Sequence, residues 1–252
     1  MDQADQYIIK AKQIWASGKD FDDSAVDYLN KAIALKPERA DLYWLKAEWL
    51  WKLEADDNQA LAAVDKYLTM IPNSENGYQM KAQILLRLKR NKEALAAVNS
   101  GVAISTRYDI LSLKADCQRR LGDIQGEEST LSLALKQKTD SRDMRLARAL
   151  ARLKLKNYQG VVEDTTSVIK NFRATTPIIN RKAYLARAEA YQQMHQTDKA
   201  RQDYLDMLKM ANSNDRVGMM EARKFFQSIG DKTNLEKVDS AIKKLDSDLS
   251  PI

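Results

Sequence analysis

A short pattern returns about every 34 residues along this chain of 252, and no other property of the sequence restricts its fold as much. A basic residue followed by alanine occurs at Lys10-Ala11, Lys46-Ala47, Lys81-Ala82, Lys114-Ala115, Arg148-Ala149 and Arg187-Ala188. The alanines are 36, 35, 33, 34 and 39 residues apart, and Ala222 follows another 34 residues on, with Glu221 in place of the basic residue. Self-similarity of this period is typical of repeat architectures, in which each unit buries its apolar face against its neighbours.

Each unit contains two stretches in which apolar residues recur three and four positions apart, as in 42–53 and 59–70. This spacing is typical of amphipathic helices. Signals that end helices lie between the stretches: Gly18, Gly122 and Gly230 follow first helices, whereas Pro37 and Pro72 follow second helices. The pattern predicts antiparallel helix hairpins. The recurring alanine would lie where two helices approach closely, because a larger side chain there would force them apart.

In this register the chain resembles the tetratricopeptide repeat (TPR) family over nearly its whole length. The second unit carries the TPR order as Tyr43, Ala47, Leu50, Ala60, Val64 and Pro72, and the sixth as Tyr184, Ala188, Tyr191, Ala200 and Tyr204. The alanine of the second helix is present at Ala25, Ala60, Ala94 and Ala200. The chain departs from the pattern at Glu127 and Val161, which replace that alanine, and by about five extra residues in 171–180.

The resemblance implies an all-α fold, a right-handed superhelical solenoid of about six TPR hairpins followed by a C-terminal capping helix pair. We expect a single solenoid over 1–246 and a flexible tail at 247–252. The expected repeats are 4–37, 38–72, 73–106, 107–140, 141–175 and 176–212, and the cap is 213–246. A terminal unit needs a polar outer face. The predicted cap supplies Arg223, Lys224, Glu236, Lys237, Lys243 and Lys244.

The composition argues against enzymes and metal sites. The chain has one cysteine and one histidine, so disulfide frameworks, Cys/His zinc sites and catalytic pairs of these residues are excluded. Eight glycines and four prolines leave little material for phosphate-binding loops. We expect Cys117 to be a packed side chain and His195 a solvated turn residue. The sequence therefore predicts a protein that is not an enzyme and binds no cofactor or metal.

The resemblance implies a concave groove lined by first helices, in which TPR proteins hold an extended or helical segment of a partner. The groove positions lie three before, one after and four after the recurring alanine. In the first two units they are Ile8, Lys12, Trp15, Trp44, Glu48 and Trp51. Trp49 points to another face and is expected to pack between helices. The alternative is that all these tryptophans fill the core, which is the commoner position of aromatic residues at helical spacing.

Further along, the predicted groove becomes polar and basic. The third unit presents Gln79, Gln83, Leu86 and Arg87, and the fourth presents Ser112, Asp116, Arg119 and Arg120. Some TPR adaptors grip an acidic chaperone terminus with lysine and asparagine at set groove positions, but this chain has Trp44, Glu48, Gln79 and Gln83 there. That ligand is therefore not inferred.

A stripe of four arginines follows in the fifth unit, at Arg142, Arg145, Arg148 and Arg152. Arg145 and Arg152 stand where the TPR pattern usually has large apolar residues. The stripe is either a solvated face with buried stems or a surface that binds carboxylate or phosphate groups of a partner.

The distribution of charge helps to choose among the possible binding partners. The net charge is +6, and residues 1–126 carry 18 basic and 18 acidic side chains, so all of the excess lies in 127–252. Acidic residues are interspersed there and stacking aromatics are few, so nucleic acid is a less favoured partner. We expect a non-enzymatic scaffold or adaptor that binds a protein or peptide partner, in bacterial secretion, pilus or envelope assembly. The alternatives are a self-associating structural protein and a basic nucleic-acid-binding repeat protein.

The compartment stays open at this stage. No transmembrane segment is expected, since no long apolar run occurs, and the first residues lack the basic and apolar blocks of a secretory signal. As it stands the sequence favours the cytoplasm. The periplasm is the alternative if a signal peptide has been removed.

Overall fold

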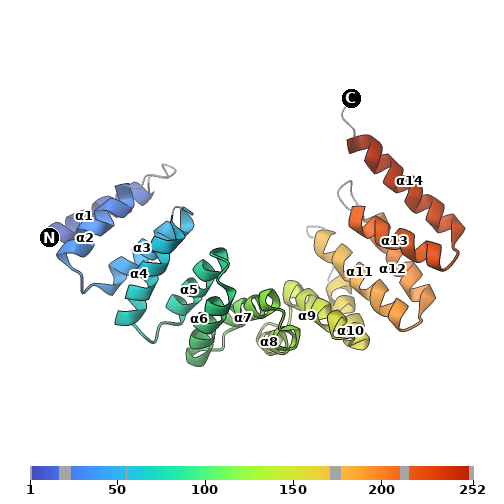
Figure 1. Cartoon of the computed structure of the whole chain (residues 1–252), viewed down its shortest axis with the longest axis horizontal. Coiled ribbons are helices and arrows are strands. Elements are labelled where there is room, and N and C mark those ends of the chain that lie inside the picture. The colour runs from blue at the N-terminus through green and yellow to red at the C-terminus, as the bar shows by residue number, and fades with distance from the viewer. Residues whose placement is uncertain (1, 17–23, 55, 171–176, 211–215, 250–252) are drawn as a thin grey trace. The chain divides into compact units, whose positions relative to one another are not determined.

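The computed structural model describes residues 2–16, 24–54, 56–170, 177–210 and 216–249 (Figure 1). These residues form fourteen α-helices and no strand. The helices are α1 Gln3–Ala16, α2 Ser24–Leu35, α3 Ala40–Lys52, α4 Asp57–Met70, α5 Glu75–Arg87, α6 Asn91–Ile104, α7 Tyr108–Leu121, α8 Ile124–Gln137, α9 Arg142–Lys154, α10 Tyr158–Lys170, α11 Pro177–Gln193, α12 Thr197–Lys209, α13 Arg216–Ser228 and α14 Lys232–Leu249. Odd-numbered helices are the first helices of hairpins and even-numbered helices are the second.

The helices pack as hairpins in chain order, as the sequence predicts. Each first helix contacts the second helix that follows it, from α1 with α2 to α13 with α14. The chain divides into two compact units, Met1–Gln137 with α1 to α8 and Lys138–Ile252 with α9 to α14. Within the first unit, α3 contacts α5 and α5 contacts α7, so these first helices form a row. The predicted repeat boundaries and the single solenoid over 1–246 stay predictions.

Two predicted features fall at the edges of the described residues. The predicted insertion near 171–180 lies partly outside them, since they resume at 177, where α11 begins. Helix α14 continues to Leu249, so the predicted tail from 247 is helical for its first three residues. The rest of that tail, 250–252, and Gly18 lie outside the described residues.

The recurring alanines are buried throughout the fold. Each of the seven is at most 2% exposed. In the second helices the four predicted alanines are also at most 2% exposed, and their replacements Val161 and Glu127 are 0% and 3% exposed. Close packing of this kind leaves no room for an added methylene group. This confirms that the alanine pattern reflects helix packing.

Among the described residues, left-handed backbone conformations follow six of the first helices. Positive φ angles occur at Glu54, Lys89, Gly122, Lys156, His195 and Gly230. At five of these sites the next amide closes a six-residue loop, as in the bond from the Gln196 N–H to the Tyr191 carbonyl at 2.8 Å. These are Schellman motifs, which satisfy carbonyl groups at the end of a helix. His195 is an exposed turn residue, as predicted.

Candidate binding surface

The predicted groove residues of α3 share one side of that helix. Trp44, Glu48 and Trp51 are four and three residues apart, a spacing that aligns side chains along an α-helix. All three are half-buried. Helix α3 contacts α5, the next first helix along the chain, and Trp51 of α3 lies against Arg87 of α5. We call Trp44, Glu48 and Trp51 the α3 face.

The four tryptophans differ in burial and in the rings that they contact. Trp49 is 3% exposed and lies in the core between α1 and α3, as the sequence predicts. The Trp15 ring stacks on it, with centroids 4.8 Å apart and planes inclined by 5°, so the half-buried Trp15 covers this part of the core. The Trp44 ring instead tilts against Tyr67 of α4, with a centroid distance of 5.2 Å. Trp44 and Trp51 both border the core without being buried in it.

The other two residues predicted to line the groove on α1 also differ in burial. Ile8 is buried in the cluster that joins α1, α2 and α3, so it contributes to stability and offers little surface. Lys12 is exposed one turn further along α1. The part of the predicted groove on α1 is therefore limited to Lys12 and the outer side of Trp15.

Arg87 is held by contacts within the protein. Its Nε donates to Asp57 Oδ2 at 2.7 Å, and its Nη2 donates to Asp57 Oδ1. Its Nη1 donates to the Trp51 carbonyl at 2.8 Å, and its guanidinium lies 5.8 Å from the centroid of the Trp51 ring. A bidentate pair neutralises the charge and fixes the orientation of the side chain. Arg87 therefore connects α5 to the α3–α4 turn and positions Trp51.

The remaining predicted groove residues on α5 and α7 lie at the surface to different degrees. Gln79 and Gln83 are half-buried, whereas Leu86 is buried. On α7, Arg119 and Arg120 both donate to Asp116, the latter from Nε at 2.9 Å. Their side chains are 50% and 45% exposed. Two guanidinium groups share one carboxylate, so this part of α7 carries one excess positive charge.

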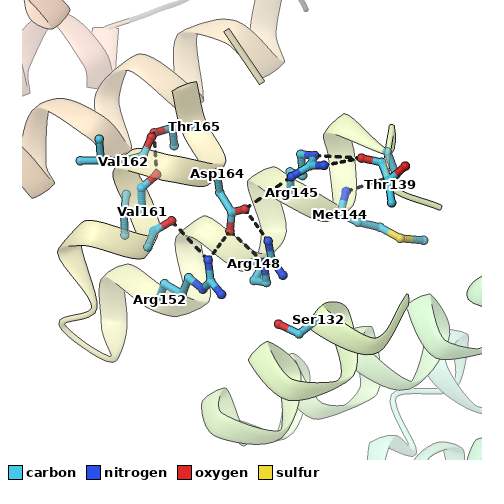
Figure 2. Close-up of polar contacts among 12 residues, drawn as sticks. Ser132, Thr139, Met144, Arg145, Arg148, Arg152, Val161, Val162, Asp164 and Thr165 are labelled. Carbon is cyan, nitrogen blue, oxygen red and sulfur yellow. Dashed lines mark hydrogen bonds and ion pairs between the residues drawn. The ribbon is translucent and has the colours of Figure 1, made fainter. Parts of the chain in front are cut away.

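Three arginines of the α9 stripe, Arg145, Arg148 and Arg152, point toward Asp164 of α10 (Figure 2). Arg148 makes two hydrogen bonds to Asp164, at 2.8 and 2.6 Å, and Arg152 Nη1 makes a third at 3.1 Å. Arg145 lies 3.9 Å from the same carboxylate and donates to the Thr139 carbonyl. The Asp164 side chain is only 2% exposed.

Arg142, the fourth residue of the stripe, donates to the Val168 carbonyl at 3.2 Å and to Asn180. The stripe thus serves contacts inside the second unit. Whether it also binds an anion from a partner stays a prediction.

Sequence reasoning missed a regular partner for these arginines. In all three hairpins of the second unit, an arginine of the first helix pairs with an aspartate sixteen residues on in the second helix. The pairs are Arg148–Asp164, Arg187–Asp203 and Arg223–Asp239. The signal was present as a repeated Arg–Asp spacing of sixteen residues. Burial raises the pKa of Asp203, although Arg187 opposes this rise.

The single cysteine, Cys117, is buried in the core. Burial raises the pKa of the Cys117 thiol to about 11, so at neutral pH it is protonated and packs as a small apolar side chain, as predicted. Among the described residues, no cluster of three or more His, Cys, Asp or Glu side chains is placed to hold a metal ion. In the same part of the chain, no helix is long and apolar enough to cross a membrane.

Comparison with solved structures identifies the fold. The C-terminal part of a TPR repeat-containing protein from Cytophaga hutchinsonii superposes with a TM-score of 0.73, at 17% identity, over 97% of this chain and 94% of that one. YrrB, a TPR protein with an unusual peptide-binding site, superposes with a TM-score of 0.68 at 16% identity, over 78% of this chain and 97% of YrrB. PilW, a type IV pilus biogenesis factor, superposes with a TM-score of 0.58 at 15% identity, over 82% of this chain and 93% of PilW.

No family model and no curated protein sequence matches the chain. The structural neighbours nevertheless cover most of it. The chain therefore has the helical-repeat fold of the TPR proteins, as its sequence predicts.

Proposed function

We propose that this chain is a non-enzymatic scaffold or adaptor that binds a segment of a partner protein along the first helices of its first unit. TPR proteins typically mediate protein–protein interactions, and their fold is generally non-catalytic. A shared fold does not fix the partner, so the proposal rests on one observation. Trp44 and Trp51 lie half-buried on one side of α3, and the neighbouring first helix α5 carries the half-buried Gln79 and Gln83.

Half-buried tryptophans are effective anchors because a large part of each ring can still be removed from water. If a partner covered about 100 Å² of each of the two rings, burial at about 25 cal/mol per Å² would contribute roughly 5 kcal/mol. Association costs about 4 to 15 kcal/mol, so the two rings alone would give weak binding. Polar contacts must add to them. The excess positive charge at Arg119 and Arg120 is suited to an acidic group of the same partner segment.

The cellular setting is also part of the proposal. One structural neighbour is a pilus biogenesis factor and another is a peptide-binding protein. The likeness to the pilus factor supports a role in bacterial secretion, pilus or envelope assembly, and the likeness to YrrB supports a peptide segment as ligand. The arrangement of groups in the described residues suggests no catalytic reaction.

The proposal is tested with peptides selected for binding to the full chain from a random display library. A selected peptide is synthesised, and its affinity is measured for the unchanged protein and for Trp44→Ala and Trp51→Ala. Each ring deletion should weaken binding about tenfold, since each anchor contributes on the order of 1 to 3 kcal/mol. Tyr191→Ala is a matched control, because Tyr191 is a half-buried aromatic on α11 in the second unit.

Circular dichroism establishes that the variants are folded. Unchanged affinity in both tryptophan variants would contradict the proposal. Light scattering over a range of concentrations distinguishes a self-associating protein, and a steep salt dependence of binding to nucleic acid would favour that partner instead.

A further inference from the structure

We infer that the α3 face binds a lysine or arginine side chain of the partner segment, an inference that rests on the proposed function and adds the chemistry of the ligand. The α3 face places one carboxylate between two indole rings on one side of a helix. A cationic side chain matches both kinds of group. Its charge is attracted by the carboxylate and by the faces of the rings, and its hydrocarbon stem packs on the rings.

Both rings are held in place before any partner binds. Trp44 lies against Tyr67, and the Tyr67 hydroxyl is 3.1 Å from Ser74 Oγ at the start of α5. Trp51 is positioned by Arg87, which contacts both its ring and its carbonyl. Contacts from α4 and α5 thus restrict the two rings. A partner loses less free energy when it does not have to order the side chains that receive it.

The Trp51 ring already has a guanidinium beside it. Arg87 lies 5.8 Å from the ring centroid, within the range of a cation–π contact. The charge of Arg87 is balanced by its bidentate pair with Asp57. A second cation that approaches the α3 face therefore meets little repulsion from Arg87.

Glu48 has a weak internal partner that an incoming cation can replace. Its carboxylate accepts a hydrogen bond from Lys52 Nζ at 2.7 Å, one turn along the same helix. The Glu48 side chain is 27% exposed and that of Lys52 is 49% exposed. An ion pair of this kind, one turn apart on a helix and open to solvent on the lysine side, stabilises a helix only slightly. Exchange of Lys52 for a cation of the partner would therefore cost little.

Other ligand groups fit this face less well. An acidic side chain would be repelled by Glu48. A purely apolar side chain would cover the indole rings but would also remove water from a carboxylate without supplying a hydrogen bond, which is unfavourable. Apart from Arg87, whose charge Asp57 balances, the cation that contacts this face is Lys52, and its charge opposes a basic ligand. Lys52 lies at an exposed position, where solvent screens it. Charge complementarity at Glu48 therefore favours a basic side chain.

The inference is tested with the peptides selected on the full chain. The selected sequences should contain a lysine or arginine next to an apolar residue. Glu48→Gln keeps the shape of the side chain and removes its charge. This substitution should lower the affinity for such a peptide about tenfold. When the basic residue of the peptide is replaced by norleucine, Glu48→Gln should have no further effect, since the interacting pair is already broken.

Glu38→Gln is the matched control, because Glu38 is an exposed carboxylate just before α3 and off the α3 face. It should leave the affinity unchanged. Selected peptides without a basic residue, or equal affinities of Glu48→Gln and the unchanged protein, would overturn this inference and leave the proposed function standing. If no selected peptide depends on Trp44 or Trp51, both proposals fail.

Discussion

At the scale of single residues, the same left-handed position is filled by residues with very different conformational preferences. Gly122 and Gly230 adopt a positive φ at little cost, because glycine has no Cβ. Lys89, Lys156 and His195 adopt it against the preference of L-residues. The Schellman hydrogen bonds that follow are equally short at glycine and non-glycine sites, for example 2.9 Å after Gly122 and 2.8 Å after His195. The fold therefore imposes this conformation whether or not the residue favours it.

His195→Gly should stabilise the protein by about 0.5 to 1 kcal/mol. Relief of the positive φ outweighs the greater entropy that glycine has in the unfolded chain. Gly122→Ala should cost about 1 kcal/mol through the backbone alone, since an added Cβ at Gly122 would meet no heavy atom within 4 Å. Urea unfolding followed by circular dichroism measures both changes. His195→Ala keeps the unfavourable conformation, so an equal gain in that variant would show that loss of the imidazole is responsible.

At the scale of helices, three pairs of like chemistry connect first to second helices in the second unit, yet they differ in burial. The Asp164 and Asp203 side chains are almost completely buried beside Arg148 and Arg187, whereas Asp239 is 44% exposed. Exposed ion pairs contribute little to stability because water solvates and screens both charges. A buried pair is different, because removal of one partner leaves an uncompensated charge out of water. The three aspartates should therefore differ greatly in their importance.

Asp164→Asn should destabilise the second unit by about 3 to 5 kcal/mol, because Arg148 and Arg152 would both lose their carboxylate in a mostly buried setting. Asp239→Asn is the matched control and should cost less than about 1 kcal/mol. Differential scanning calorimetry of the two variants compares these losses. A similarly small loss in both variants would mean that water or other groups compensate the arginines around Asp164.

The arginine stripe also shows what the sequence could and could not predict. The spacing of Arg142, Arg145, Arg148 and Arg152 on one side of a helix follows from the period of 3.6 residues, and the helix was predicted correctly. The sequence does not show which side of α9 packs against α10, because arginines occur both on solvated faces and in buried ion pairs. Asp164 decides between them, and it lies on a different helix. Pairing across a hairpin depends on helix orientation, which a pattern within one helix does not contain.

At the scale of the whole molecule, the alanine period predicts the hairpins but not the division of the chain. Ala115 and Ala149 are 34 residues apart, within the range of 33 to 36 found inside the first unit, although they lie in different compact units. The period reports only that each hairpin can pack on another. The period also does not predict burial within one helix: Trp49 is buried, whereas Trp44 and Trp51 of the same helix α3 are half-buried. The packing of side chains from α1, α4 and α5 around them makes this difference.

The last hairpin should stabilise the hairpin before it. Tyr204 of α12 stacks on Phe225 of α13 at a centroid distance of 4.8 Å and meets the edge of Phe226 at 6.3 Å. Phe226 is completely buried in a cluster that includes residues of α11, α12 and α14. Phe226→Ala should therefore cost about 3 to 5 kcal/mol, through lost burial and the cavity that it leaves.

Hydrogen exchange measured by mass spectrometry locates the effect of Phe226→Ala. Protection should fall in α11 to α14 and stay unchanged in α3 to α6, because repeat proteins transmit stability mainly between neighbouring hairpins. Val217→Ala is the control on the same helix, since Val217 is 76% exposed and its truncation should change nothing. An equal loss of protection in α3 to α6 would mean that the chain unfolds as one cooperative unit. The stability of α1 to α8 would then depend on the integrity of the last hairpin.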